Sequence, residues 1–280
     1  MARNKNDQRP STAKARAREA ARLEAERLKQ EREARARRRR TVTIASIAGG
    51  VVVTVALALA VFFTIPRESV ENLEAQPAGA QSDGGILIGK DGVAGGDAPS
   101  AADAVTVEIY SDYMCPYCGM LEKGIASRLN EMREAGEVRV ILHPLAFLDS
   151  YSNETQYSTR ALNHAAQVAK DEPDKFMAFH EALFEDQPEE NTDGLSDSEI
   201  VEIANRVGIS AEVSAKFGAM EMSDWVAAVS NQAMADGITG TPRVFLTQPG
   251  GKRQGWESWS TGDIKGAVAK VKEGKDPDDQ

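Results

Sequence analysis

Cysteine and histidine are scarce in this sequence, with two cysteines and three histidines among 280 residues. A structural zinc site takes about four ligands, and no two of His143, His164 and His180 have the H-x₃₋₅-H spacing of a zinc motif. His180 lies on an apolar helical face, where a packed core histidine is expected. The chain also lacks an internal repeat, a phosphate loop and the glycine fingerprint of dinucleotide-binding proteins. The sequence therefore implies no metal and no organic cofactor.

Charge is absent between Thr41 and Pro66, where most residues are apolar. At about 1.5 Å per residue, a helix of this length crosses a hydrocarbon layer roughly 30 Å thick. A buried core helix or a cleaved signal peptide fits less well, because the run has no polar face and follows a leader of 40 residues. Residues 41–66 are therefore interpreted as a single uncleaved transmembrane anchor.

The basic residues before this run predict its orientation. Residues 1–40 contain 15 Lys and Arg and 6 Asp and Glu, a net charge of +9, whereas the remaining residues carry −19. Positively charged flanks stay cytoplasmic, so residues 1–40 are expected to form a basic cytoplasmic tail near anionic lipid head groups. Nothing besides charge favours nucleic acid as a partner. Residues 67–280 would then lie outside the cytoplasm, in an oxidising compartment.

Residues 67–101 are rich in Gly, Ala, Asp and Pro, which predicts a flexible linker, although Ile86–Gly89 also fits a short edge strand. The globular domain is expected at 102–280. It opens with a β-prone segment at 104–110 and a helical pattern after the cysteines. A second strand then begins at Val138 and runs into a loop at Pro144 within 138–148. This order predicts a βαβ unit with both cysteines at the start of its helix.

The next part, about 152–236, has helical patterns throughout. One of its helices opens with the capping box of Ser196 and Glu199. The chain returns to β-prone sequence at 241–248, turns at 249–252 and ends in a helix around 260–274. An α/β fold with a helical insertion between two β-containing parts is the expected architecture.

The two cysteines, Cys115 and Cys118, are separated only by Pro116 and Tyr117. A disulfide between them would close almost no loop, so a purely structural bond would stabilise little. A redox dithiol fits the pattern better. The free N–H groups and the dipole at a helix N-terminus stabilise a Cys115 thiolate, and Pro116 suits the first helical turn. Cys118 follows one turn deeper, where it can resolve a mixed disulfide on Cys115.

Three segments together resemble one family. The stretch VTVEIYSDYMCPYC, the helical region of about 80 residues and GITGTPRVFL (237–246) follow one another as in the DsbA-like thioredoxin-fold oxidoreductases. The similarity covers roughly residues 85–275. It implies a thioredoxin core with an inserted helical domain, preceded here by the single transmembrane helix.

The same resemblance implies roles for individual residues. Cys115 would be the nucleophile and Cys118 the resolving thiol of a redox-active disulfide. Pro242 would be cis and packed beside the cysteines, and the Thr241 backbone would pair with an extended substrate peptide. Pro116 and Tyr117 would help to set the reduction potential.

One position departs from the family pattern. Many thioredoxin-fold enzymes carry a buried acid six residues before the first cysteine, and this chain has Ile109 there. Strand alternation directs Glu108 to the opposite face, and Asp112 is expected as a loop or capping residue. Which acid assists proton transfer stays open.

These features predict a membrane-anchored, extracytoplasmic thiol–disulfide oxidoreductase that introduces disulfides into exported proteins. A membrane partner would reoxidise its dithiol, and a monomer is expected. The alternatives are a reductase or isomerase with the same chemistry, a non-catalytic chaperone-like module that binds peptides near Pro242, and a metal carrier that uses both cysteines.

Overall fold

The computed structural model describes residues 27, 29 and 69–279. The predicted anchor at 41–66 and nearly all of the predicted basic tail lie outside these residues. Within the described part of the chain, no helix has the length and apolar character needed to cross a membrane. The chain divides into a unit up to Pro66 and a unit from Arg67 to Gln280, and the second contains the predicted catalytic domain.

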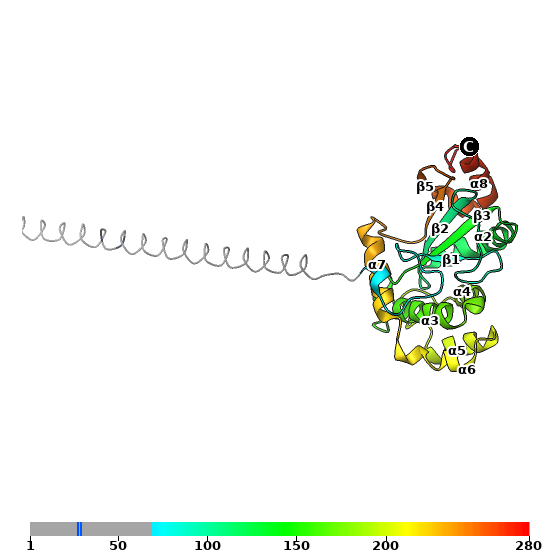
Figure 1. Cartoon of the computed structure of the whole chain (residues 1–280). Coiled ribbons are helices and arrows are strands. Elements are labelled where there is room, and N and C mark those ends of the chain that lie inside the picture. Colours follow the sequence, from blue (N-terminus) through cyan, green and yellow to red (C-terminus); the bar gives the residue numbers. More distant parts are fainter. Residues whose placement is uncertain (1–26, 28, 30–68, 280) are drawn as a thin grey trace, which may run out of the picture. The chain divides into compact units, whose positions relative to one another are not determined.

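A five-stranded sheet forms the centre of this domain (Figure 1). The strand order is β1-β3-β2-β4-β5. The central strands β2 and β3 are parallel, and the other neighbours are antiparallel. The strands are β1 (Ile86–Ile88), β2 (Val105–Ser111), β3 (Val138–Pro144), β4 (Arg243–Thr247) and β5 (Arg253–Gly255).

The predicted βαβ unit is confirmed as β2, α2 (Pro116–Glu134) and β3. Helix α2 packs against β3 and against α8 (Ile264–Lys272), which contacts β2 and β4. A helix must connect two parallel neighbours, and its apolar side then covers the sheet. On this helix the side chain of Met120 is exposed, whereas that of Met132 is buried.

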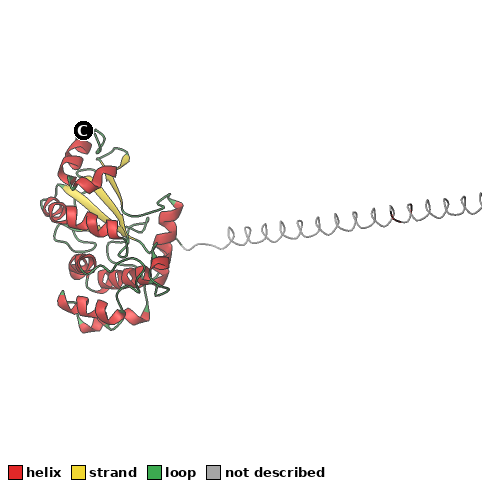
Figure 2. Ribbon diagram, turned by 180° about the vertical axis from the view of Figure 1, so that it is seen from behind, coloured by secondary structure: helices red, strands yellow, loops and turns green. Residues whose placement is uncertain are grey.

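Between β3 and β4 the chain forms the expected helical region, seen from both sides in Figures 1 and 2. Its buried faces are rich in alanine and phenylalanine, which allows close packing of helices α3, α4 and α7. The helices are α3 (Tyr157–Asp171), α4 (Phe176–Glu185), α5 (Asp197–Arg206), α6 (Ala211–Ser214) and α7 (Ser223–Ala235). Short 3-10 helices are η1 (Val70–Asn72), η2 (Asp149–Tyr151), η3 (Pro173–Lys175), η4 (Phe217–Ala219) and η5 (Glu257–Thr261).

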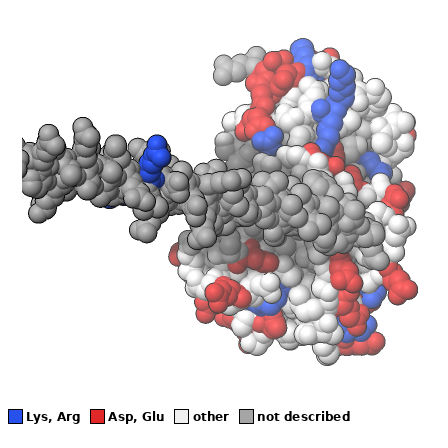
Figure 3. Space-filling view, turned by 90° about the vertical axis from the view of Figure 1, so that its left-hand side faces the viewer, with Lys and Arg blue, Asp and Glu red and all other residues white. Residues whose placement is uncertain are grey.

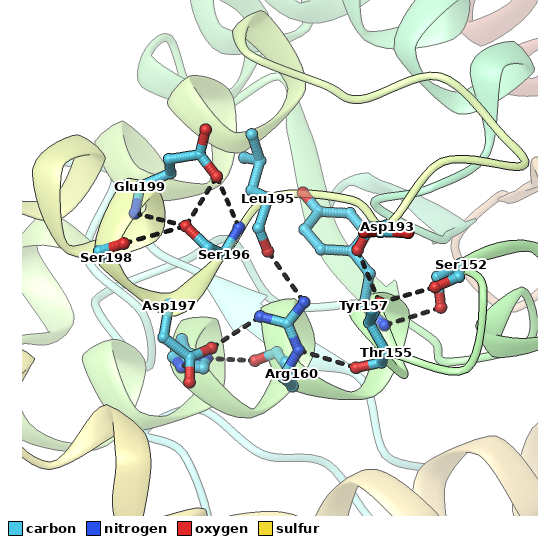
Figure 4. A network of polar contacts seen from close by, with 11 residues as sticks. Ser152, Thr155, Tyr157, Arg160, Asp193, Leu195, Ser196, Asp197, Ser198 and Glu199 are labelled. Atoms are coloured by element: carbon cyan, nitrogen blue, oxygen red, sulfur yellow. Dashed lines mark hydrogen bonds and ion pairs between the residues drawn. The ribbon is translucent and has the colours of Figure 1, made fainter.

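A polar network fixes the start of α5 against α3 (Figure 4). Arg160 donates to the Asp197 carboxylate at 2.6 Å and to the carbonyl oxygens of Thr155 and Leu195, both at 2.9 Å. The predicted capping box is present, because Ser196 and Glu199 exchange backbone and side-chain hydrogen bonds. One guanidinium thus joins two segments that are more than 30 residues apart in the sequence.

The predicted flexible linker is wrong for its described part, residues 69–101. Val70, Ile86, Ile88 and Ala94 are buried, and β1 is the edge strand that Ile86–Gly89 suggested. The glycines in this segment form tight turns between the buried residues. A Cβ on Gly79 would lie 2.5 Å from the Gly95 backbone nitrogen, so this close approach requires glycine.

The domain surface carries both signs of charge, although residues 41–280 have a net charge of −19. On the face in Figure 3, acidic and basic side chains form separate small groups among uncharged residues. Some charged side chains of the domain form ion pairs, such as Arg243 with Glu257 at 3.0 Å. Exposed pairs of this kind contribute little to stability, so the fold depends mainly on its apolar core.

Two methionines on α2 give a matched test of this packing. Replacement of Met132 by Ala is expected to lower the free energy of unfolding by about 2–5 kcal/mol, because the side chain is buried under the helix. Met120→Ala on the exposed side should change it by less than about 0.5 kcal/mol. Urea denaturation of both variants checks this, and equal losses would contradict the orientation of α2.

Candidate active site

The two cysteines lie where the sequence placed them, at the first turn of α2. Cys115 is the N-cap residue, and Pro116 occupies the first helical position. The Cys115 carbonyl accepts the N–H groups of Cys118 at 3.0 Å and Gly119 at 3.3 Å. Proline costs nothing here, because a first-turn N–H has no partner within a helix. The Cys118 side chain therefore follows Cys115 by one helical turn.

Cys115 is less accessible than expected. It keeps 4 % of its surface exposed, and Cys118 keeps 1 %. The Cys115 thiol donates a hydrogen bond to the Thr241 carbonyl oxygen at 3.4 Å, although the two residues are 126 positions apart. The Thr241–Pro242 peptide bond is cis, as the family resemblance implied. The loop before β4 thus lies directly against the reactive sulfur.

The electrostatic surroundings of the two thiols differ. A hydrogen bond from the Cys118 thiol lowers the pKa of Cys115 to about 6, and the backbone N–H groups of Tyr117 and Cys118 act in the same direction against the effect of burial. Burial raises the pKa of Cys118 well above its ordinary value, and the neighbouring Cys115 raises it further. Of the two residues, Cys115 is therefore the one that loses its proton more readily.

Asp112 is not the simple loop residue that the sequence suggested. Its carboxylate is fully buried and accepts four hydrogen bonds, from Met114 N, Ser158 Oγ, Phe147 N and Leu148 N, at 2.7–3.0 Å. Burial raises the pKa of Asp112 to about 6 in spite of these donors. Its backbone also takes part in the site, because Asp112 N–H donates to Cys118 Sγ at 3.5 Å and Asp112 O accepts from Cys115 N at 3.0 Å.

Gln187, just after α4, is a site residue that sequence reasoning missed. Its side-chain amide donates to the carbonyl oxygens of Tyr113 at 3.0 Å and Cys115 at 2.8 Å. A Cβ on Gly119 would lie 2.2 Å from Gln187 Oε1, so glycine at that position leaves room for this side chain. The insertion thus contacts the turn at residues 113–118, here called the redox turn, from outside the βαβ unit. No local sequence signal marks Gln187, because its partners lie more than 70 residues earlier.

A second contact between the insertion and the redox turn involves His180. The Tyr113 hydroxyl and His180 Nδ1 share a hydrogen bond of 2.9 Å, and Phe184 packs on the Tyr113 ring at 5.0 Å. His180 is 1 % exposed, which confirms the expected core histidine. On the outer side of the turn, Tyr117 and Met120 are exposed and offer an apolar surface beside the cysteines.

Glu108 and Ile109 point to opposite faces of the sheet, as strand alternation predicted. Ile109 belongs to the apolar core with both cysteines, and Glu108 pairs with Arg253 Nε at 2.9 Å on the other face. Among the described residues, neither cysteine belongs to a group of three or more side chains placed to bind a metal ion. The arrangement suits thiol exchange, with one stabilised thiolate and one buried partner thiol.

Comparisons with known proteins agree with this chemistry. A family model described as thioredoxin matches residues 96–261. The solved structure of MdbA from Actinomyces oris, a thiol-disulfide oxidoreductase, is 27 % identical with a TM-score of 0.52, and the match covers 64 % of this chain and 84 % of that one. BdbD from Bacillus subtilis shares the fold with a TM-score of 0.55 and 21 % identity, over 71 % of this chain and 98 % of that one.

Curated relatives match over shorter segments. Disulfide bond formation protein D of Bacillus subtilis is 32 % identical over 104 residues, which are 37 % of this chain and 40 % of that protein. Serine/threonine-protein kinase PknE of Mycobacterium tuberculosis is 33 % identical over 113 residues, 39 % of this chain but only 20 % of the kinase. The chain thus spans a fifth to two fifths of these relatives. Because the thioredoxin model matches more than half of its length, the chain belongs to the thioredoxin family, and it is similar to thiol–disulfide oxidoreductases such as MdbA.

Proposed function

We propose that this protein is a membrane-anchored, extracytoplasmic oxidoreductase that gives the Cys115–Cys118 disulfide to exported proteins. The observation that carries this proposal is the contrast between the two thiols. A Cys115 thiolate stabilised at a helix N-terminus lowers the free energy of the reduced enzyme. A dithiol with a stabilised reduced form tends to donate its disulfide to other proteins.

The reaction proceeds in two exchange steps. A substrate thiolate attacks Cys115 Sγ, the enzyme disulfide breaks, and Cys118 leaves with the electron pair and takes up a proton. A second substrate thiolate then attacks the substrate sulfur of the mixed disulfide, and Cys115 leaves as a thiolate. The substrate loses two electrons, and the enzyme gains them as a dithiol.

Thr241 and Pro242 are proposed to bind the substrate backbone. The Thr241 carbonyl lies against Cys115 Sγ, and Thr241 N–H has no acceptor among the described residues. An extended peptide that pairs with this segment would place its cysteine next to Cys115. Tyr117 and Met120 would add apolar contacts from the opposite side.

The apolar run at 41–66 is proposed to anchor the enzyme, with the basic residues 1–40 on the cytoplasmic side. The proposed reaction leaves the enzyme reduced, so a second protein must take up two electrons before the next cycle. An anchor would keep the dithiol near a membrane-bound oxidant of this kind.

The direction of transfer is tested by the reduction potential of the Cys115–Cys118 couple, measured with the full-length protein in detergent against glutathione buffers. The proposal predicts a potential more oxidising than about −200 mV. A value near about −270 mV would identify a reductant and contradict the oxidase assignment. The absence of any reversible couple would contradict the redox role itself.

Trapping of mixed disulfides with substrate proteins distinguishes an enzyme from a module that only binds peptides. Cys118→Ala should accumulate mixed disulfides between Cys115 and substrate cysteines, because the resolving thiol is missing. Cys115→Ala should reduce thiol oxidation to the uncatalysed rate, and the double variant should form no adduct. Non-reducing electrophoresis and mass spectrometry of the adducts check both expectations. Full activity of Cys115→Ala would refute the assignment of the nucleophile.

The thiolate absorbance near 240 nm of the reduced protein should titrate with a midpoint at about pH 6, not at 9.0. Because the pKa of Cys115 is lower in the folded state than in the unfolded state, its ionisation adds to the free energy of unfolding. This contribution is fully present above pH 9 and is lost as the pH falls through 6.

Gln187→Ala should raise the pKa of Cys115. The variant loses the two hydrogen bonds to the turn, so the backbone N–H groups of the turn are no longer held in position near the sulfur. Gln232→Ala on the exposed side of α7 is the matched control and should leave the titration unchanged. Equal curves for Gln187→Ala and the unmodified protein would remove Gln187 from the site.

A further inference from the structure

A second group of polar side chains lies on the face of the sheet away from the cysteines. Along β2, Val107 and Ile109 point into the core that contains Cys115 and Cys118. Glu108 and Tyr110 point to the other face, beside His143 of β3. The redox chemistry proposed above does not use these side chains.

Three of these groups converge from separate parts of the chain. Asp83 precedes β1, Glu108 is in β2 and His143 is in β3, and their ligand atoms all lie within 4.8 Å of one another. His143 Nε2 is 3.7 Å from Glu108 Oε1. Two ligands that bind one zinc ion at about 2.1 Å in tetrahedral geometry stand about 3.4 Å apart. The imidazole and the Glu108 carboxylate therefore need almost no movement to share an ion.

His143 provides an independent sign of a missing partner. The side chain is 2 % exposed, and Nε2 makes no hydrogen bond within the described part of the protein. An unsatisfied buried nitrogen costs about 1–3 kcal/mol unless another group or an ion meets it. The ring is also held in place, because Tyr110 stacks on it at 4.0 Å with an interplanar angle of 11°.

The space beside Nε2 is kept open by Gly85. A Cβ at this position would lie 2.6 Å from His143 Cε1 and 2.8 Å from Nε2. Asp83, two residues earlier, has an exposed side chain, so one of the three groups faces the solvent.

Arg253 sets the orientation and the charge of the group. Its Nε donates to Glu108 Oε2 at 2.9 Å, and its Nη2 donates to the Tyr110 hydroxyl at 2.7 Å. These bonds leave Glu108 Oε1 facing His143. With a neutral imidazole, the two carboxylates and the guanidinium sum to one negative charge, which favours a cation.

We propose that Asp83, Glu108 and His143 bind a divalent transition-metal ion, with zinc as the best fit. One imidazole and two carboxylates form a mixed nitrogen and oxygen ligand set that suits zinc better than calcium or magnesium, which prefer oxygen alone. The ion would join the segment before the edge strand β1 to the two central strands. Its expected role is structural, and it does not depend on the proposed oxidase activity.

Zinc binding is tested by calorimetric titration of the full-length protein with zinc chloride. Cys115→Ala and Cys118→Ala are present in every sample, so that the thiolates cannot bind the metal. The parent should bind one equivalent and unfold at a higher temperature with zinc than without it. Asp83→Asn and His143→Gln should each weaken binding at least tenfold, because each removes a ligand and even the loss of a group that only orients a ligand typically costs 10–100-fold.

Asp91→Asn is the matched control. Asp91 is an exposed aspartate of the same segment, and its carboxylate accepts a local backbone N–H at 3.2 Å, as that of Asp83 does at 3.1 Å. This variant should bind zinc like the parent. The proposal is overturned if the parent does not bind zinc, if Asp83→Asn binds as tightly as Asp91→Asn, or if calcium binds as tightly as zinc. In the first case His143 and Glu108 would form only a direct ion pair.

Discussion

The buried carboxylate of Asp112 holds the parts of the catalytic domain in one arrangement. It accepts backbone N–H groups from the redox turn and from the loop after β3, and the Ser158 hydroxyl from α3. Transfer of a carboxylate from water into a protein interior is costly, and four donors offset much of that cost. The same bonds require the end of β2, the loop after β3 and the inserted helices to keep their relative positions. The short spacing between Asp112 and Cys115 carries this constraint directly into the active site.

The chemistry of the cysteines follows from their place in this frame. Both sulfurs sit at the start of α2, yet they differ in acidity. Cys115 accepts a hydrogen bond from Cys118 and faces the free N–H groups of the first turn, whereas Cys118 lies one turn deeper in the apolar core. The insertion also contacts this turn, since Gln187 donates to the carbonyl groups on either side of Met114. The loop at Thr241 closes the site from the opposite end of the chain. A single helix terminus is thus held by contacts with two distant segments.

Local patterns in the sequence predicted many elements correctly. The strand at 104–110, the strand that runs from Val138 into a loop at Pro144, the capping box of Ser196 and the position of the cysteines at the start of α2 are all confirmed. Alternation, capping and proline preferences act over a few residues, so local sequence reveals them. The prediction of a flexible linker was wrong for its described residues, 69–101. Its glycines form turns between buried residues, and composition alone does not distinguish such turns from a flexible chain.

The sequence by itself determined the family, the redox pair and the order of strands and helices, since each of these rests on residues that are neighbours in the chain. Only the tertiary structure decided which distant groups act together. Asp112 accepts hydrogen bonds in the interior, and Gln187 donates to the redox turn. Asp83 lies near Glu108 and His143 on one face of the sheet. These contacts join residues 25 to 74 positions apart, and spacing along the chain carries no signal for them. Their energies depend on burial and on the direction of individual donors, and both are fixed only when the strands and helices pack together.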